Sequence, residues 1–456
     1  MKGARELALD ALLKIEADGA YSNLAVNRAL AGHSLSRKDA ALATELIYGT
    51  IQRKNTLDFY ISRYVSGSSD RLEPWVLQLL RLSFYQLAYL DRIPPHAAVN
   101  EAVAVAKKRG HAGIAGLVNA VLRRAVREPE RMSFPDNLPP AAAIGLAHSH
   151  PEWLVARWIR QFGEERTRRI CEANNRPPKA AIRVNRLRAG MEEVLAELRQ
   201  GGLSARPSAI APDGIIAEGG GHLAALPGFA AGRFSIQDES SMLVAGVLAP
   251  EPGMAVLDMC AAPGGKTAHI AEKMGDRGVV VANDLHPHKA KLIEEQLARL
   301  GITCARTETG DAADLPKRHP PESFDRVLLD APCTGFGVIR RKPDLKWTRS
   351  EADIAALASV QARLLDAAAG LLKPGGLLVY STCTLEREEN EKQVEAFLAR
   401  HPEFEPDASA AGRLPDALKA SFAAPGLLRI FPMDYGSDGF FIAALRKRSF
   451  HGRTGL

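Results

Sequence analysis

The sequence predicts three parts of different fold class: an all-α bundle, a small α+β module and an α/β domain built on a doubly wound parallel sheet. Three observations carry this prediction. Residues 4–127 show helical apolar periodicity without a strand signal. Prolines gather between residues 128 and 140. From about residue 234, strands alternate strictly with helices. A chain of 456 residues is long enough for roughly three domains.

The first part, residues 1–130, is expected to be a helical bundle. Leu72–Leu90 is a long apolar-periodic helix, and we assign its aromatic residues to the core because they recur at helical spacing. Ser36-Arg37-Lys38-Asp39 has the pattern of a capping box and predicts the start of a helix. A break at Pro94-Pro95 separates these helices from the two that close the bundle.

Most of the net positive charge lies in the first 140 residues. Residues 1–140 hold 19 lysines and arginines and 14 aspartates and glutamates, whereas the whole chain has a net charge of +6. The strongest basic patch combines Lys107-Lys108-Arg109 with Arg123, Arg124 and Arg127. Such a patch fits contact with nucleic-acid phosphates. The same charges also suit a solvated helical surface, and at a helix end they complement the helix dipole.

Two shorter parts follow the bundle. Residues 131–150 are expected to be a proline-rich linker. Residues 151–233 are expected to form a small α+β module, because a strand at residues 181–184 precedes a helix at Met191–Leu198. We expect this module to contact RNA, but it lacks the aromatic-rich strand that stacks bases in the commonest RNA-binding sheets, and its role stays open.

The α/β domain is expected to span residues 234–447. Its predicted strands are Met254–Met259, Gly278–Asp284, Thr303–Thr307, Phe324–Asp330 and Gly376–Tyr380, followed by the pair Leu427–Phe431 and Gly439–Leu445. In such a sheet, ligands bind beyond the carboxyl ends of the strands.

A loop rich in glycine and small residues follows the first of these strands, and it is the best candidate for a cofactor site. Asp284 ends the next strand about 20 residues later, where an acidic side chain typically binds ribose hydroxyls. Asp311 follows the third strand, in position for an adenine amino group. The residues predicted to bind the cofactor are Cys260, Ala261, Ala262, Pro263, Gly264, Gly265, Lys266, Asp284, Asp311 and Asp330.

Two other cofactor classes fit the loop less well. Gly265-Lys266-Thr267 has the form of the end of a phosphate-binding P-loop, but that motif needs glycine where the chain has Cys260. A dinucleotide oxidoreductase needs G-x-G-x-x-G, which the loop is not, and it leaves two cysteines unexplained. S-adenosylmethionine accounts for the loop and both aspartates together. No metal is expected, because the five cysteines lack metal-ligand spacing.

Two cysteines follow neighbouring strands of the predicted sheet, in Asp330-Ala331-Pro332-Cys333 and Ser381-Thr382-Cys383. A lone cysteine is usually a small buried hydrophobe, and we read Cys171, Cys304 and Cys260 in that way. Two thiols beside a cofactor loop instead indicate nucleophilic chemistry. Enzymes that methylate amino nitrogen typically carry Asn/Asp-Pro-Pro-Tyr/Phe at the fourth strand, so carbon is the better acceptor.

Carbon 5 of a pyrimidine becomes nucleophilic only after a thiolate adds at carbon 6. A carboxyl group at the N3 and N4 edge of the ring stabilises the charge that then develops, and Asp330 is the candidate. Lys266 is expected to act as a supporting cation. From these residues alone, either Cys333 or Cys383 can be the nucleophile.

The same residues resemble the RNA cytosine-C5 methyltransferases of the Sun/Fmu family. The resemblance rests on Phe234–Ser241, Asp258–Lys266, Asp330–Trp347 and Ser381–Thr384, and it covers nearly the whole chain. Residues Pro94–Val103 and Asn119–Arg124 resemble a NusB-type RNA-binding bundle.

The resemblance implies that Cys383 is the nucleophile, that Cys333 helps to release the product, and that the substrate is one cytosine in 16S ribosomal RNA. One departure is visible: Thr334-Gly335-Phe336-Gly337 stands where the family commonly has Ser-Gly/Ala-Thr-Gly. We expect Phe336 to alter contacts beside the base without changing the chemistry.

The expected setting is a reduced, cytoplasmic, soluble monomer that acts on naked or partly assembled small-subunit RNA, with no membrane partner. Two alternatives stay open. The catalytic motifs do not encode the RNA target, so transfer RNA is an alternative substrate. A NusB-like, non-catalytic RNA-binding assembly factor is the alternative from another functional class.

Overall fold

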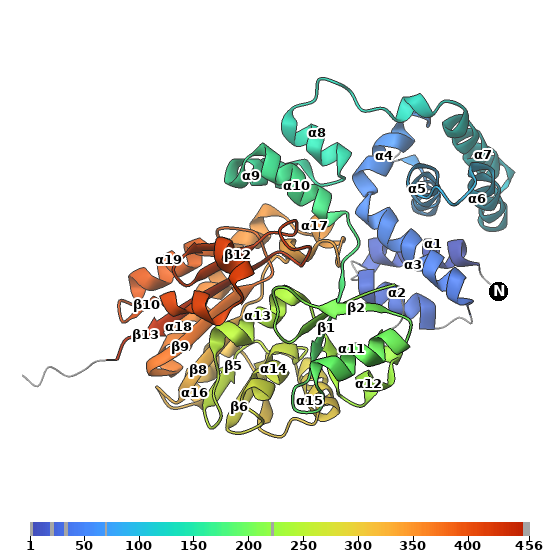
Figure 1. Ribbon diagram of the computed structural model, residues 1–456. Coiled ribbons are helices and arrows are strands. Elements are labelled where there is room, and N and C mark those ends of the chain that lie inside the picture. Colours follow the sequence, from blue (N-terminus) through green and yellow to red (C-terminus); the bar gives the residue numbers. More distant parts are fainter. Residues whose placement is uncertain (1–2, 19–21, 32–34, 69–70, 220–222, 450–456) are drawn as a thin grey trace, which may run out of the picture. The chain divides into compact units, whose positions relative to one another are not determined.

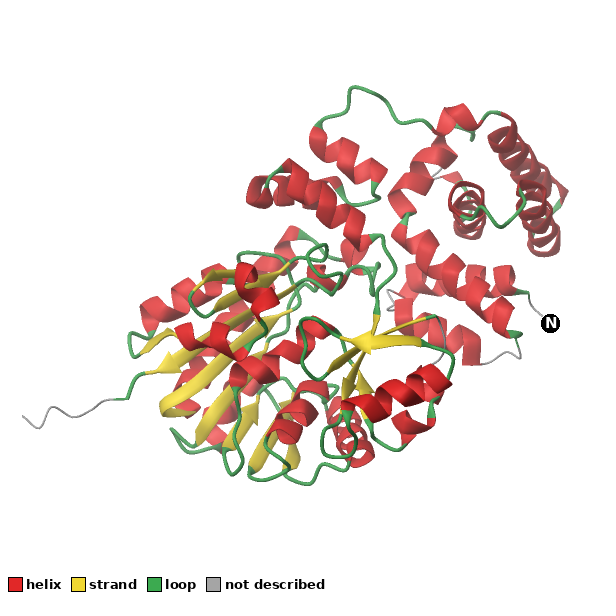
Figure 2. Cartoon of the chain, viewed as in Figure 1, coloured by secondary structure: helices red, strands yellow, loops and turns green. Residues whose placement is uncertain are grey.

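The computed structural model describes residues 3–18, 22–31, 35–68, 71–219 and 223–449. The chain divides into two compact units. The helical unit comprises Met1–Pro177 together with Ile339–Arg349, and the sheet unit comprises Pro178–Val338 and Ser350–Leu456. Figure 1 labels the elements in chain order, and Figure 2 separates helices from strands.

The helical unit confirms the all-α prediction for the first part of the chain. Its helices are α1 (Ala4–Asp18), α2 (Ser22–Ala31), α3 (Arg37–Gln52), α4 (Lys54–Ser62), α5 (Pro74–Tyr89), α6 (Pro95–Arg109), α7 (Ala112–Arg127), α8 (Pro140–Ala147), α9 (Glu152–Phe162), α10 (Glu164–Asn174) and the short α17 (Leu345–Thr348). Ser36 caps α3 by accepting a hydrogen bond from the Asp39 amide. Of the aromatic residues of α5, Phe84 and Tyr85 are buried in the core as predicted, whereas Trp75 and Tyr89 are partly buried and pack against it.

Two segments differ from the predicted domain organisation. The predicted linker contains helix α8, which begins at Pro140, a position where the missing amide proton costs no hydrogen bond. The predicted α+β module begins at residue 151, whereas by its contacts the chain up to Pro177 belongs to the helical unit. The reason is packing: α9 and α10 lie against α8, and the Trp158 side chain on α9 is fully buried.

A four-stranded antiparallel sheet forms the small α+β module, as predicted. Its strands lie in the order β2 (Ser204–Pro207), β3 (Gly214–Glu218), β1 (Ala180–Val184) and β4 (Phe234–Ile236), with helices α11 (Met191–Gln200) and α12 (Pro227–Ala230). The apolar side chains of β1 and β3 pack with α11 around Phe234.

The large sheet confirms the doubly wound prediction. Five parallel strands lie in the order β9 (Leu372–Thr382), β8 (Phe324–Asp330), β5 (Ala255–Asp258), β6 (Val279–Asp284) and β7 (Ala305–Thr309). The antiparallel strands β13 (Phe440–Lys447), β12 (Leu427–Ile430) and β11 (Phe422–Ala424) extend the sheet beyond β9, and β10 (Phe404–Pro406) pairs with β13.

Helices cover both faces of this sheet (Figure 2). Alternate residues of β8 point to opposite sides, so Leu328 joins one core cluster while Val327 and Leu329 join the other. The first cluster includes α13 (Glu239–Leu248), α14 (Gly265–Lys273) and α15 (Pro287–Leu300), and the second includes α18 (Glu351–Leu371) and α19 (Glu391–Arg400).

Among the described residues, α18 is the one helix long and apolar enough to cross a membrane by length and composition. The apolar face of α18 packs inside the sheet unit, where Leu364, Leu365 and Ala368 are buried in the second core cluster. Gln361 of the same helix is also buried and makes polar contacts inside the unit. These contacts identify α18 as a core helix of the sheet unit.

A buried arginine joins the small module to the loop that follows β5. Arg183 on β1 is fully buried, and its guanidinium forms a two-point ion pair with Glu272 of α14 at 2.7 and 3.1 Å. The same guanidinium donates to the carbonyl of Gly265 at 2.5 Å and to the Gln237 side chain. One side chain therefore fixes the position at which α14 begins.

We expect Arg183→Met to lower the free energy of unfolding by about 3–5 kcal/mol, because the substitution leaves the Glu272 carboxylate buried without its counterion. Urea unfolding monitored by circular dichroism measures this loss. The double variant Arg183→Met/Glu272→Leu should recover part of it, since no charge then remains in the core.

A matched control lies in the same module. Arg206 and Glu218 approach to 4.0 Å, with side chains that are 55% and 61% exposed. Arg206→Met should therefore change the free energy of unfolding by less than about 0.5 kcal/mol. An equal loss for both arginine variants would contradict a specific role for the buried pair.

Candidate active site

A cavity of about 220 Å³ lies beyond the carboxyl ends of β5 and β8. Most of the predicted cofactor residues line it. The lining comprises Ile236, Gln237, Ser241, Asp258, Cys260, Ala261, Ala262, Pro263, Gly265, Lys266 and Asp330. Three of these residues lie where the chain passes from β4 of the small module into α13: Ile236, Gln237 and Ser241. In the sequence they stood out only as part of a family motif. Three predicted residues, Gly264, Asp284 and Asp311, are not among the lining residues.

The loop after β5 depends on a glycine at its turn into α14. Gly264 has φ +96°, a left-handed conformation that other residues rarely adopt. A Cβ atom at this position would lie 3.1 Å from Ile293 Cα. Gly264 therefore sets the conformation of the loop without lining the cavity, whereas Pro263 and Gly265 on either side of it do line the cavity.

Asp258 places a buried carboxyl group in the cavity wall. Its Oδ2 accepts a hydrogen bond from Thr267 Oγ1 at 2.7 Å. Within the described structure, its Oδ1 is buried and has no partner. Burial raises the pKa of Asp258 to about 7, and the charge of Asp330 acts in the same direction. The unpaired oxygen indicates that a ligand in the cavity would complete its hydrogen bonding.

Asp284 and Asp311 each accept backbone hydrogen bonds at or just beyond the end of a strand of the sheet. Asp284 ends β6, and its carboxylate accepts hydrogen bonds from the amides of Ala262 and His286, both at 3.2 Å. Asp311 follows β7 and accepts from the Ala313 amide at 2.9 Å. The two carboxylates thus follow neighbouring parallel strands, and Asp284 directly supports a loop residue that lines the cavity.

A lysine and an aspartate that line the cavity form an ion pair. Lys266 Nζ lies 2.7 Å from Asp330 Oδ2, and Ser381 Oγ donates to Asp330 Oδ1 at 2.7 Å. Burial alone would lower the pKa of Lys266, but the Asp330 carboxylate outweighs it and raises the pKa. Lys266 therefore stays protonated and holds one carboxylate oxygen in a fixed position.

The two predicted thiols lie side by side. Strands β8 and β9 are parallel neighbours with Asp330 opposite Ser381, so the loops that follow them leave the same edge of the sheet. Cys333 Sγ lies 3.4 Å from Cys383 Sγ. The hydrogen bond to Cys383, together with burial, raises the pKa of Cys333 well above its usual value. Either sulfur atom can be the donor of this contact, so the geometry alone gives the two thiols no separate roles.

A buried glutamate that the sequence analysis missed holds the Cys333 loop. Glu389 accepts hydrogen bonds from the Thr334 amide at 2.9 Å, from Thr334 Oγ1 at 2.5 Å and from Gln361 Nε2 at 3.0 Å. Thr334 Oγ1 also lies 2.7 Å from Thr384 Oγ1 in the loop that carries Cys383. Because acidic runs usually lie on a solvated surface, the sequence around Glu389 does not indicate that this side chain is buried. The one signal for a role at the site was that Glu389 lies near the Thr-Cys-Thr motif in the sequence.

Phe336 lies in the loop that carries Cys333, and its ring is fully buried. Its effect on contacts beside a base stays a prediction. Next to it, Gly337 donates a hydrogen bond to the Cys383 carbonyl at 2.9 Å. A Cβ atom at Gly337 would lie 2.0 Å from the Gly439 carbonyl oxygen. The close approach of these backbones explains why a glycine occupies this position.

The other cysteines lie outside the thiol pair. Cys260 lines the cavity, but burial raises its pKa well above the usual value, and the nearby Asp258 and Asp330 carboxylates act in the same direction. Burial also raises the pKa of Cys171 and of Cys304 to about 12. These groups are not poised to ionise, in agreement with their interpretation as packing residues.

The predicted basic patch of the helical unit is partly neutralised by ion pairs. Lys108 pairs with Glu6 at 2.8 Å, Arg124 and Arg127 pair with Glu128 at 2.9 and 3.2 Å, and Arg109 pairs with Asp10. Lys107 and Arg123 instead line a groove between α6 and α7, together with Asn100 and Asn119. The polar groups available to a ligand on this patch are therefore concentrated in that groove.

Comparison with known proteins identifies the three parts of the chain. Residues 245–446 match the 16S rRNA methyltransferase RsmB/F model, residues 2–127 match the NusB family, and residues 150–223 match the ferredoxin-like domain of RsmF/B-like methyltransferases. The ferredoxin-like match therefore starts near the predicted module boundary, although α9 and α10 pack with the helical unit.

Relatives cover nearly the whole chain. The probable ribosomal RNA small subunit methyltransferase B of Bacillus subtilis is 46% identical over 444 residues, which cover 97% of this chain and 98% of the relative. The crystal structure of PH0851 matches 98% of this chain and 99% of its own, with a TM-score of 0.81 and 29% identity. NSun6 from Pyrococcus horikoshii with SFG, an analogue of S-adenosylmethionine, matches 65% of this chain and 98% of its own, with a TM-score of 0.58 and 27% identity. The chain therefore belongs to the 16S rRNA methyltransferase RsmB/F family.

Proposed function

We propose that this S-adenosylmethionine-dependent enzyme transfers a methyl group to carbon 5 of one cytosine in 16S ribosomal RNA, through a covalent cysteine–cytosine intermediate. The observation that carries the proposal is the thiol pair, Cys333 and Cys383, with 3.4 Å between the sulfur atoms. Asp330 ends β8, one of the two strands that lead to the thiols, and it pairs with Lys266 in the first turn of α14. Methyl transfer to an amino nitrogen would need neither thiol.

The cavity beside Asp258 suits the cofactor. When bound, S-adenosylmethionine supplies an electrophilic methyl group and carries positive charge. The unpaired Oδ1 of Asp258 offers an acceptor inside the cavity, and the small side chains of Ala261 and Ala262 let a ligand approach the loop backbone closely. Asp284 and Asp311 stand at the ends of the next two strands, where ribose and adenine contacts are expected.

Cys383 is the proposed nucleophile. Its thiolate adds to carbon 6 of cytosine, and the ring electrons move toward carbon 5 as negative charge develops at the N3 and N4 edge. Asp330, held between Lys266 and Ser381, is the carboxyl group proposed to contact that edge. Lys266 balances the charge of Asp330, and the activated carbon 5 accepts the methyl group.

Elimination then restores the aromatic ring. A base removes the proton from carbon 5, the electron pair reforms the double bond between carbons 5 and 6, and the Cys383 sulfur leaves as a thiolate. Cys333 is the proposed partner in this step, because its thiol lies within hydrogen-bonding distance of the departing sulfur. The raised pKa of Cys333 supports this division of roles, since a protonated neighbour stabilises the thiolate of Cys383.

The proposed setting is the cytoplasm, where reducing conditions keep both thiols free. We further propose that the enzyme works as a monomer on naked or partly assembled small-subunit RNA. The groove with Lys107 and Arg123 supports RNA contact by the helical unit.

Substitution of the two cysteines should have opposite consequences. Cys383→Ala should abolish methyl transfer, whereas Cys333→Ala should accumulate a covalent protein–RNA adduct because release of the sulfur is slowed. Transfer of a labelled methyl group and denaturing gels measure both effects. Cys304→Ala is the matched control and should behave as the unmodified enzyme. The reverse pattern for Cys333 and Cys383 would overturn the assignment.

Asp258 should make cofactor binding depend on pH. Its carboxyl group, with a pKa of about 7, is mostly protonated below pH 7, and a cationic ligand favours the ionised form. Affinity for S-adenosylmethionine should therefore rise with pH up to about 7 and then level off. Asp258→Asn should bind more weakly at pH 8 and should lack this dependence, as isothermal titration calorimetry can show.

The same group also affects stability in the absence of cofactor. Unfolded aspartate ionises near pH 3.9, so between about pH 4 and 7 the folded state binds the extra proton. The contribution of Asp258 to the free energy of unfolding should decrease as pH rises through this window. The control is Asp314→Asn, because the Asp314 side chain is exposed. If Asp258→Asn and Asp314→Asn both retain the wild-type pH profile of cofactor binding, the proposal for Asp258 is wrong.

The RNA target can be tested directly. RNA from cells that lack the protein should lose one 5-methylcytosine in 16S ribosomal RNA and none in transfer RNA, as measured by bisulfite sequencing. Loss of the mark only from transfer RNA would move the target to that molecule. Tight binding of small-subunit RNA without transfer of labelled methyl groups would instead favour a non-catalytic assembly factor.

A further inference from the structure

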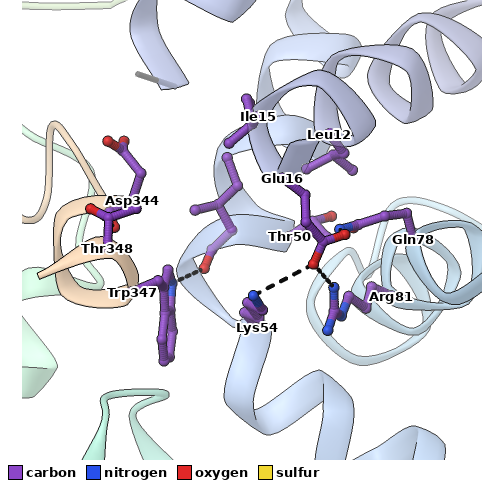
Figure 3. A pocket seen from close by; sticks show the side chains of 11 residues that line it. Leu12, Ile15, Glu16, Thr50, Lys54, Gln78, Arg81, Asp344, Trp347 and Thr348 are labelled. Atoms are coloured by element: carbon purple, nitrogen blue, oxygen red, sulfur yellow. Dashed lines mark hydrogen bonds and ion pairs between the residues drawn. The ribbon is translucent and has the colours of Figure 1, made fainter. Parts of the chain in front are cut away.

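The helical unit contains a second cavity, of about 230 Å³, and no cysteine is among its lining residues. Figure 3 shows its walls, which come from α1, from the neighbouring helices α3, α4 and α5, and from the segment Ile339–Arg349. The lining residues are Leu12, Ile15, Glu16, Thr50, Ile51, Lys54, Gln78, Arg81, Asp344, Trp347 and Thr348. The cavity is smaller than the roughly 300–1,000 Å³ of pockets for drug-sized ligands, so it suits a single small group.

One wall is an indole ring held in a fixed position. Trp347 Nε1 donates a hydrogen bond to the Ile51 carbonyl at 2.7 Å, and the adjacent Lys346 Nζ donates to the Gln52 carbonyl at 2.9 Å. Asp344 of the same segment accepts hydrogen bonds from the backbone amide and hydroxyl of Ser22. These bonds attach the segment to the helical unit at three points, and the ring contributes a flat apolar surface to the cavity.

One polar group at the cavity is unsatisfied. Thr50 is 1% exposed, and in the part of the chain that the structure describes its hydroxyl has no hydrogen-bond partner. A buried hydroxyl without a partner is unfavourable, so a group that bonds to it would stabilise this site. The cavity is open to solvent on one side, where the side chains of Glu16 and Lys54 are 37% and 36% exposed.

The charges at the cavity largely cancel. Arg81 pairs with Glu16 at 3.1 Å and with Asp58 at 2.6 Å, and Lys54 lies 3.6 Å from Glu16. The carboxylate of Asp344 also lines the cavity. Two carboxylates disfavour a phosphate group, and the two cations disfavour a metal ion. The chemistry therefore fits a neutral, flat ligand with apolar faces and hydrogen-bonding groups along its edge.

We propose that this cavity binds one unpaired nucleobase of the RNA substrate. The base would lie against Trp347, with its edge toward the hydroxyl of Thr50 and the carboxylate of Glu16. Aromatic side chains that stack on bases and polar groups that bond to their edges are the usual means of single-stranded RNA recognition. The inference rests on the proposed function only in taking RNA as the ligand, and it adds a binding site in the helical unit.

The most specific test of the base site is Thr50→Val, which removes the hydroxyl and keeps the side-chain volume. It should leave the free energy of unfolding unchanged or raise it, because an unsatisfied polar group is lost, yet it should weaken binding of a 16S ribosomal RNA transcript about fivefold at fixed salt. The matched control is Thr56→Val. Thr56 is equally buried, but its hydroxyl donates to the Leu146 carbonyl at 2.6 Å, so this variant should lose stability and keep its RNA affinity.

Tryptophan fluorescence tests whether a base is the ligand. A single-stranded RNA oligonucleotide should quench the wild-type protein, and Trp347→Phe should lose most of that quenching. An abasic strand of equal length should quench far less. Equal quenching by the abasic strand, or unchanged RNA affinity of Thr50→Val, would overturn the proposal. Quenching by a tryptophan-containing tripeptide but not by RNA would overturn it in favour of a protein partner.

An assay of methyl transfer distinguishes failure of the base site from failure of the proposed function. If the wild-type enzyme methylates 16S ribosomal RNA and Thr50→Val binds that RNA equally well, the base site is wrong and the proposed activity stands. If the wild-type enzyme transfers no methyl group but Thr50→Val weakens binding of the oligonucleotide, the base site is supported and the proposed activity is wrong.

Discussion

The parallel pairing of β8 with β9 is the constraint on which the site depends. The register places Asp330 opposite Ser381, and the two loops that follow then bring the sulfur atoms of Cys333 and Cys383 to 3.4 Å. The cysteines are 50 positions apart in the chain, yet their contact is set by two strand ends. The buried Glu389 then holds the first loop in the conformation that the pairing allows.

The cofactor cavity likewise depends on a contact between parts of the sheet unit that are distant in sequence. The small module contributes Arg183, whose guanidinium bonds to the carbonyl that begins α14 and to the Gln237 side chain at the cavity wall. The module thus has a structural role at the cavity that is independent of any contact with RNA. The ion pair between Arg183 and Glu272, which water does not reach, joins the sheet of the module to α14, the helix that follows the cofactor loop. That burial makes the geometry of the loop sensitive to the integrity of the module.

Features that depend on local pattern could be predicted from the sequence. Strand ends, the glycine turn at Gly264 and the proximity of Cys333 and Cys383 all follow from apolar runs and the rules of parallel sheets. Features that depend on long-range burial could not. An acidic run does not reveal that Glu389 is buried, a phenylalanine beside a reactive loop does not reveal that Phe336 points into the core, and nothing near Trp347 indicates that it packs among helices made some 300 residues earlier.

The path of the Ile339–Arg349 segment bears on how the protein is made. Ribosomes release the chain from its amino end, and domains generally fold as units during synthesis. The helical unit is complete only when Trp347 has emerged, by which time most of the sheet unit has also been synthesised. A fragment that ends after α10 lacks one wall of the cavity, and a fragment that begins at the small module carries Trp347 without its partner, the Ile51 carbonyl. The two units are therefore interdependent in the order of biosynthesis.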